Sequence, residues 1–127
     1  MAHILIVDDD PAILDLMAEI LKNSGHRIST SRTGLETLHT LGLEPENTAT
    51  ELPDLILLDV MMPQSDGYTV ATVIRNREQT RKIPIVLVSA LEKMSPLFEA
   101  TVKIQGFLTK PFTPQQLLTV VAKTLAA

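Results

Sequence analysis

Three short runs of aliphatic residues set the strongest limit on what this chain can fold into. They cover residues 4–7, 55–58 and 85–88, and within each run apolar side chains follow one another without interruption. A strand with one solvent-exposed face would alternate apolar and polar residues, whereas a parallel strand covered on both faces need not alternate. The runs therefore predict a parallel sheet enclosed between two layers of helices.

Between these runs, apolar residues recur with the spacing of helices. Leu14, Met17 and Leu21 stand on one helical face, as do Val70 and Ile74 further along the chain. We expect strands near 3–7, 26–30, 54–58, 84–88 and 106–109, and helices near 11–23, 34–42, 67–77, 96–105 and 114–125. Residues 43–53 have no apolar period, which indicates a surface loop. Alternating strands and helices with right-handed crossovers predict an α/β domain in which all five strands are parallel.

Capping signals support three of the predicted helix starts. Asp10 stands directly before a proline, an arrangement typical of an N-cap followed by the first helical residue, so we assign Asp10 to the cap and not to a site. Thr33 with Glu36, and Thr113 with Gln116, have the spacing of capping boxes.

Length and composition exclude several classes of function. The 127 residues allow one domain, 1–127, and the net charge of -4 without a basic run argues against direct nucleic-acid binding. No apolar stretch is long enough to span a membrane, and the chain has no cysteine, as is common in a reducing compartment. We therefore expect a soluble, cytoplasmic protein.

The candidate functional residues all follow predicted strands. Asp8 and Asp9 end the first run, Asp59 ends the third, Ser89 ends the fourth, and Lys110 follows the fifth predicted strand. Ligands of parallel α/β sheets bind beyond the carboxyl ends of the strands. All five residues are therefore expected at one edge of the sheet.

Three carboxylates at one edge repel one another and require protons or a cation to neutralise them. A hard divalent cation with oxygen ligands fits this requirement, and Mg²⁺ is the best candidate because it is also the usual partner of phosphoryl oxygens. Lys110 can pair with a phosphoryl oxygen, and the Ser89 hydroxyl can donate a hydrogen bond to another. The set predicts chemistry on a phosphoryl group.

The chain resembles response-regulator receiver domains. The motifs that carry the resemblance lie at residues 4–10, 57–63, 66–67, 89–90 and 109–112, and the resemblance covers essentially the whole chain. It implies a flavodoxin-like doubly wound (βα)5 sandwich with strand order 2-1-3-4-5. By the same resemblance, Asp59 would be the phosphoacceptor. Asp9 would bind Mg²⁺ directly, Asp8 mainly through water, and the Met61 backbone carbonyl would complete the metal ligands.

The resemblance also implies a switch and a set of partners. Ser89 and Lys110 would contact the phosphoryl group, the peptide bond between Lys110 and Pro111 would be cis, and Phe107 would occupy the aromatic switch position, unless it is an ordinary core residue. The donor would be the phosphohistidine of a sensor histidine kinase or a histidine phosphotransfer protein. An unidentified output partner would bind the fourth helix, fifth strand and fifth helix. Such a domain is a signalling switch that catalyses only its own phosphorylation and dephosphorylation.

Other functions remain possible from the sequence. A Mg²⁺-dependent phosphohydrolase of the haloacid-dehalogenase type also forms an aspartyl phosphate, but it requires an acid where this chain has Met61. A flavin mononucleotide module would need a phosphate-binding loop after the first strand, where three consecutive aspartates would repel the phosphate. A degenerate receiver that acts only as a docking module is the third alternative.

Overall fold

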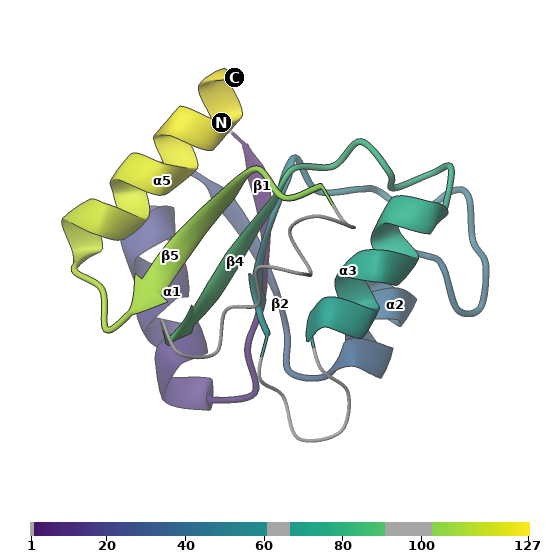
Figure 1. Ribbon diagram of the computed structural model, residues 1–127, viewed down its shortest axis with the longest axis horizontal. Helices are drawn as coiled ribbons and strands as arrows, with labels where there is room; N and C mark the ends of the chain where they lie inside the picture. The colour runs from purple at the N-terminus through teal and green to yellow at the C-terminus, as the bar shows by residue number, and fades with distance from the viewer. Residues whose placement is uncertain (1, 61–66, 91–102) are drawn as a thin grey trace.

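The computed structural model describes residues 2–60, 67–90 and 103–127, and its centre is one parallel sheet. The strands are β1 (His3–Val7), β2 (Arg27–Ser31), β3 (Leu55–Asp59), β4 (Ile85–Ala90) and β5 (Gly106–Lys110). Their order across the sheet is β2-β1-β3-β4-β5, and every neighbouring pair is parallel (Figure 1). The predicted fold class, strand order and strand positions are confirmed, with shifts of one or two residues at the strand ends.

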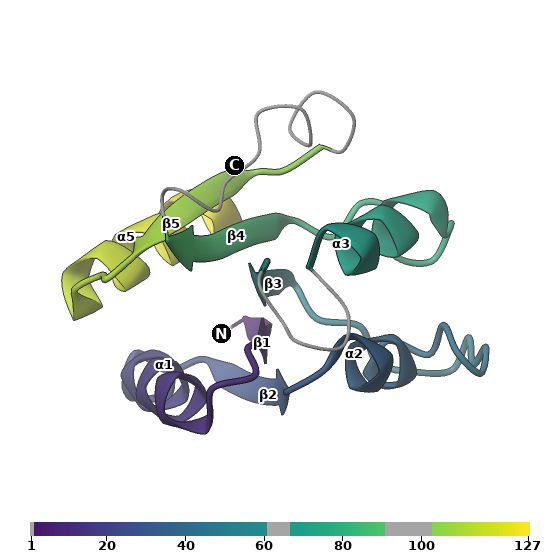
Figure 2. The ribbon, with the colours of Figure 1, turned by 60° about the horizontal axis from the view of Figure 1, so that its bottom comes forward.

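Helices cover both faces of the sheet. They are α1 (Pro11–Asn23), α2 (Gly34–Thr40), α3 (Gly67–Asn76) and α5 (Pro114–Ala126). Figure 2 shows α1 and α5 on one side of the sheet and α2 and α3 on the other. The predicted helix at 96–105 falls mostly outside the described residues, and residues 103–105 are not helical, so its predicted end is wrong. No helix in the described ranges has the length and apolar character needed to cross a bilayer.

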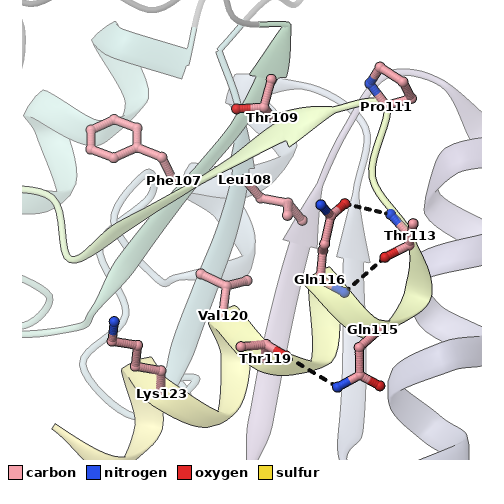
Figure 3. A pocket seen from close by; sticks show the side chains of 10 residues that line it. All are labelled: Phe107, Leu108, Thr109, Pro111, Thr113, Gln115, Gln116, Thr119, Val120 and Lys123. Atoms are coloured by element: carbon pink, nitrogen blue, oxygen red, sulfur yellow. Dashed lines mark hydrogen bonds between the residues drawn. The ribbon is translucent and has the colours of Figure 1, made fainter.

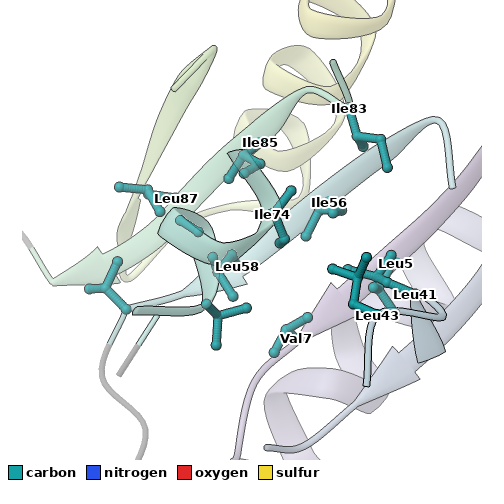
Figure 4. Packing of buried hydrophobic residues seen from close by; sticks show 13 residues of the cluster. Leu5, Val7, Leu41, Leu43, Ile56, Leu58, Ile74, Ile83, Ile85 and Leu87 are labelled. Atoms are coloured by element: carbon teal, nitrogen blue, oxygen red, sulfur yellow. The ribbon is translucent and has the colours of Figure 1, made fainter. Parts of the chain in front are cut away.

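The core consists of two aliphatic layers, one on each face of the sheet. Successive strand residues point to opposite faces, so Leu5 and Val7 contribute to one layer and Ile4 and Ile6 to the other. Figure 4 shows the layer that packs against α2 and α3. Burial on both faces explains why the central strands have continuous apolar runs.

The capping predictions are confirmed at two helices and half correct at the third. The Asp10 side chain accepts from the Ala12 amide at 2.9 Å, and both bonds of the Thr113 capping box form. At α2 the Thr33 hydroxyl accepts from the Glu36 amide, but the Glu36 carboxylate accepts from the amide of Arg32, one residue earlier than a capping box requires.

The segment after α2 differs from the predicted surface loop. The helix ends at Thr40, and Gly42 has a positive φ of 71°, a conformation that glycine adopts without strain. This turn brings Leu43 into the core, where it is only 2% exposed, and Pro53 at the far end is also buried. The loop is therefore exposed only in its middle.

Arg75 joins three segments at the sheet end away from the predicted site. Its guanidinium donates to the main-chain carbonyls of Lys103, Arg81 and Ile83 and to the side chain of Gln105, at 2.6–3.0 Å. Partial burial lowers the pKa of this guanidinium below its usual value. Because Gln105 also accepts from the Ile85 amide, Arg75 ties the end of α3 to the starts of β4 and β5.

Candidate metal centre

The carboxylates of Asp8, Asp9 and Asp59 converge at the carboxyl edge of the sheet. Strands β1 and β3 are neighbours, and the pairing of Val7 with Leu58 places the residues that follow, Asp8 and Asp59, side by side. One oxygen from each of the three carboxylates lies within 4.8 Å of the other two. Asp8 and Asp59 are 1% and 4% exposed, whereas Asp9 is half-buried.

Main-chain hydrogen bonds hold the first two acids in place. The Asp8 amide donates to the Ser31 carbonyl at 3.1 Å, which continues the pairing of β1 with β2 by one residue. One Asp8 carboxylate oxygen then accepts from the Asp10 amide at 2.9 Å, so the chain turns sharply into α1. This turn keeps Asp9 at the mouth of the site.

The third acid depends on a close backbone approach. Asp59 is the last residue of β3, and the Val60 carbonyl accepts from the Gly67 amide at 3.0 Å. A Cβ atom on Gly67 would lie 2.7 Å from the Val60 Cα and would also overlap the Asp59 carbonyl oxygen. The start of α3 can therefore approach the strand end only because residue 67 is glycine.

In the part of the chain that the structure describes, Lys110 is the cation within this cluster. Its Nζ lies 2.8 Å from one Asp8 carboxylate oxygen and 3.8 Å from an oxygen of Asp59. The peptide bond between Lys110 and Pro111 is cis, as the sequence analysis predicts.

A cavity of about 350 Å³ opens onto the acids. Ser89, on β4, is 2% exposed and lines the cavity. Within residues 2–60, 67–90 and 103–127, the lining consists of Asp8, Asp9, Asp10, Asp59, Ser89, Ala90 and Lys110. The structure thus brings together five of the predicted site residues, whereas Met61 lies outside the described residues.

The charges and donor atoms fit a divalent cation. Asp8, Asp9 and Asp59 carry three negative charges against the single positive charge of Lys110, which leaves an excess of two. Carboxylate oxygens are the ligands that Mg²⁺ prefers, and a cation with ligands at about 2.1 Å separates opposite ligands by about 4.2 Å, close to the spread of these oxygens. The cluster could therefore hold Mg²⁺.

Phe107, the predicted switch residue, lies on β5 away from the acids and is 39% exposed. A second hollow of about 500 Å³ lies between β5 and α5, and Phe107 and Pro111 are part of its lining (Figure 3). In the same view Leu108 points toward α5 from the opposite face of the strand. Phe107 is therefore an exposed aromatic residue and is not part of the two core layers.

One residue near the site was missed by the sequence analysis. Arg32 directly follows β2, so it lies at the same edge of the sheet, and its Nη2 is 3.5 Å from the Asp9 carbonyl oxygen. The available signal was that Arg32, like the acids, directly follows a strand. The predicted second strand ended at residue 30, so Arg32 was not recognised as the residue after the strand.

Comparisons with known proteins agree with this geometry. The family model described as the response regulator receiver domain matches residues 4–122. The DNA-binding dual master transcriptional regulator RpaA of Synechocystis is 37% identical over 125 residues, which cover 93% of this chain and 46% of that protein. The chain spans less than half the length of the curated relatives it matches.

Two solved structures show the same architecture. The chemotaxis response regulator CheY4 of Vibrio cholerae is 28% identical with a TM-score of 0.83, and the match covers 98% of each chain. The receiver domain of sensor histidine kinase PA1611 from Pseudomonas aeruginosa has a TM-score of 0.83 at 23% identity, covering 99% of this chain and 98% of that one. Its structure has a magnesium ion coordinated in the active-site cleft.

The chain belongs to the response regulator receiver domain family of two-component signalling. Receiver domains are signalling switches that work with histidine kinases and output domains, and the acidic cluster fits the phosphorylation site of such a domain.

Proposed function

We propose that residues 1–127 form one receiver domain, which takes a phosphoryl group onto the Asp59 carboxylate. The observation that carries this proposal is the position of Asp59: its carboxylate is buried, borders the cavity, and lies 3.8 Å from the Lys110 ammonium. Asp59 ends the central strand β3, between the strand that leads to Asp8 and the strand that carries Ser89. A phosphoryl group on its carboxylate would therefore lie beside the other acids, Ser89 and Lys110.

In the transfer, an Asp59 oxygen forms a bond to phosphorus while the bond from phosphorus to the donor nitrogen breaks. The histidine nitrogen of the donor keeps the electron pair of the broken bond. Phosphoryl transfer depends mainly on positioning and on neutralisation of the phosphoryl oxygens, so a carboxylate can serve as the nucleophile. Lys110 would pair with one phosphoryl oxygen, and the Ser89 hydroxyl would donate to another.

Mg²⁺ would be held by the carboxylates of Asp8, Asp9 and Asp59 and by the Met61 backbone carbonyl. When bound, the ion would neutralise charge on the carboxylates and on the phosphoryl oxygens. The cluster geometry supports this assignment, and the magnesium in the receiver domain of PA1611 adds support by analogy.

The donor would be a phosphohistidine of a sensor histidine kinase or a histidine phosphotransfer protein, in the cytoplasm. After transfer, Ser89 would move toward the phosphoryl group, and Phe107 would respond by repacking. The change would reach an output partner through β5, α5 and the fourth helix expected before β5. The domain would act as a switch that catalyses only its own phosphorylation and dephosphorylation.

The test is incubation with acetyl phosphate and Mg²⁺, followed by intact mass measurement. Wild-type protein should gain one phosphoryl group, and a chelator should prevent the gain. Hydroxylamine should remove the group, because the adduct is an acyl phosphate, whereas a serine ester would survive. Asp59→Ala should give no adduct, while Asp15→Ala, which removes a carboxylate from an exposed position of α1, should be labelled like wild type.

Three results would contradict the proposal. An unchanged adduct on Asp59→Ala would show that another residue is the acceptor. Continuous consumption of acetyl phosphate with almost no adduct would favour the phosphohydrolase instead, and an inert wild-type protein would favour a docking module.

A further inference from the structure

Cations flank the acids from both edges of the sheet. Because the strand order is β2-β1-β3-β4-β5, the acids at the carboxyl ends of β1 and β3 lie between Arg32, which follows β2, and Lys110, which ends β5. Lys110 forms ion pairs with Asp8 and Asp59. Arg32 is exposed and does not line the cavity, so it lies outside the cluster, beyond Asp9.

The position of Arg32 is defined by contacts at its backbone and its side chain. Its amide donates to the Glu36 carboxylate at 3.3 Å, next to the N-cap of α2, and its Nη2 reaches the Asp9 carbonyl oxygen at 3.5 Å. A main-chain carbonyl carries no net charge. The contact therefore directs the guanidinium toward the site without cancelling its positive charge.

A charge balance shows what this guanidinium adds. Among the described residues, four aspartates and one lysine line the cavity, and the side chains of these five residues carry a net charge of -3. One divalent cation would bring this to -1, and a phosphoryl donor with two negative charges would still be repelled. Arg32 lies outside this lining, and its guanidinium adds one positive charge at the Asp9 side of the mouth.

We propose that Arg32 is a steering residue that attracts the anionic phosphoryl donor to the mouth of the site. The proposal rests on the function proposed above, because it concerns the rate of the same transfer. Arg32 would act through its field during approach and would not bind the metal or the phosphoryl group after transfer. Such steering raises association rates and weakens as salt screens the charges.

The size of the effect follows from Coulomb's law. A unit positive charge attracts a dianion about 10 Å away in water strongly enough to raise the labelling rate about fourfold at low ionic strength. Screening at 0.15 M salt, where the Debye length is about 8 Å, reduces this to about 1.5-fold. A steering charge should therefore lose most of its effect on the labelling rate when salt is added, whereas a structural role of Arg32 would give the same loss of rate at both salt concentrations.

The experiment measures the rate of acetyl phosphate labelling at saturating Mg²⁺, at low salt and at 0.15 M salt. Arg32→Gln should be slowed about fourfold at low salt and about 1.5-fold at the higher salt, and Arg32→Lys should keep most of the rate. Arg27→Gln is the matched control, because Arg27 is an exposed arginine at the other end of β2, about 16 Å away along the strand. Its rate should equal that of wild type at 0.15 M salt, and at low salt it should be slowed clearly less than Arg32→Gln.

Mg²⁺ affinity, measured by calorimetry, gives the second readout. If Arg32 acts as a steering charge, its removal should leave Mg²⁺ affinity unchanged or slightly higher, since a repelling cation is lost. Weaker Mg²⁺ binding with a salt-independent loss of rate would show instead that Arg32 positions the Asp9 loop, and would overturn the proposal. Equal slowing of Arg27→Gln would overturn it too.

If Arg32→Gln is labelled as fast as the wild-type protein, only the role of Arg32 is contradicted. The absence of any wild-type adduct would contradict the proposed function, and the steering role with it.

Discussion

Replacing Asp9 by asparagine should stabilise the metal-free protein, although it removes a charged residue from the site. The Asp9 carboxylate lies within 4.8 Å of those of Asp8 and Asp59, and asparagine has nearly the same shape without the charge. Among the described residues, the ion pairs of Lys110 are with Asp8 and Asp59 and not with Asp9. Asp9 is therefore the acid whose repulsion is least compensated.

The magnitude follows from this distance. Two like charges 4.8 Å apart repel by about 3.5 kcal/mol at an effective dielectric constant of 20 and by about 0.9 kcal/mol in water. Asp9 is half-buried, and Lys110 offsets part of its repulsion from the other two acids. We expect Asp9→Asn to raise the free energy of unfolding by about 1–2 kcal/mol, or the Tm by about 3–8 °C for a domain of this size.

Mg²⁺ should reverse the order of stability. A ligand at one hundred times its Kd stabilises the folded state by about 2.7 kcal/mol, and the variant should lose most of this gain together with a metal ligand. Circular dichroism melting curves should therefore show Asp9→Asn above wild type in chelator and level with it or below it in excess Mg²⁺. Asp15→Asn, on an exposed position of α1, removes the same charge and should show no such crossing. A lower Tm for Asp9→Asn in chelator would refute the repulsion argument.

Three further substitutions test contacts that hold the site and the surrounding fold in place. Gly67→Ala should lower stability by about 1–3 kcal/mol in urea unfolding, because a Cβ would overlap the Val60 backbone, and unchanged stability would contradict that close approach. Arg75→Met should cost about 2 kcal/mol through its lost hydrogen bonds, with the exposed Arg81→Met as the control. Thr113→Ala should cost about 1 kcal/mol by removing the α5 cap, and Thr113→Ser should restore most of it.

The central part of the fold could be predicted because its sequence pattern has one physical cause. β1, β3 and β4 are covered on both faces, so each is a continuous apolar run, and each run ends where the chain leaves the core. Asp8, Asp59 and Ser89 mark those ends. Predicting these strands therefore also predicted which polar residues would share an edge.

The segment from Gly42 to Pro53 could not be predicted in the same way. Its buried residues, Leu43 and Pro53, follow no helical or strand period, and their burial depends on the turn at Gly42 and on packing against distant parts of the chain. A pattern within the segment does not contain this information. Only the tertiary contacts decide which of its residues enter the core.

The edge strand β2 shows why Arg32 was harder to find than the acids. An edge strand pairs on one side only, and β2 has the polar sequence Arg-Ile-Ser-Thr-Ser, with just one of its five residues fully buried. Without a continuous apolar run, the end of the strand is not marked, and the residue that follows it reads as an ordinary surface arginine. The same exposure suits a steering charge, because a guanidinium in water keeps its charge without the desolvation cost that a central position would impose. Strong strand patterns thus mark the buried acids of the site, whereas its outer cation follows the strand with the weakest pattern.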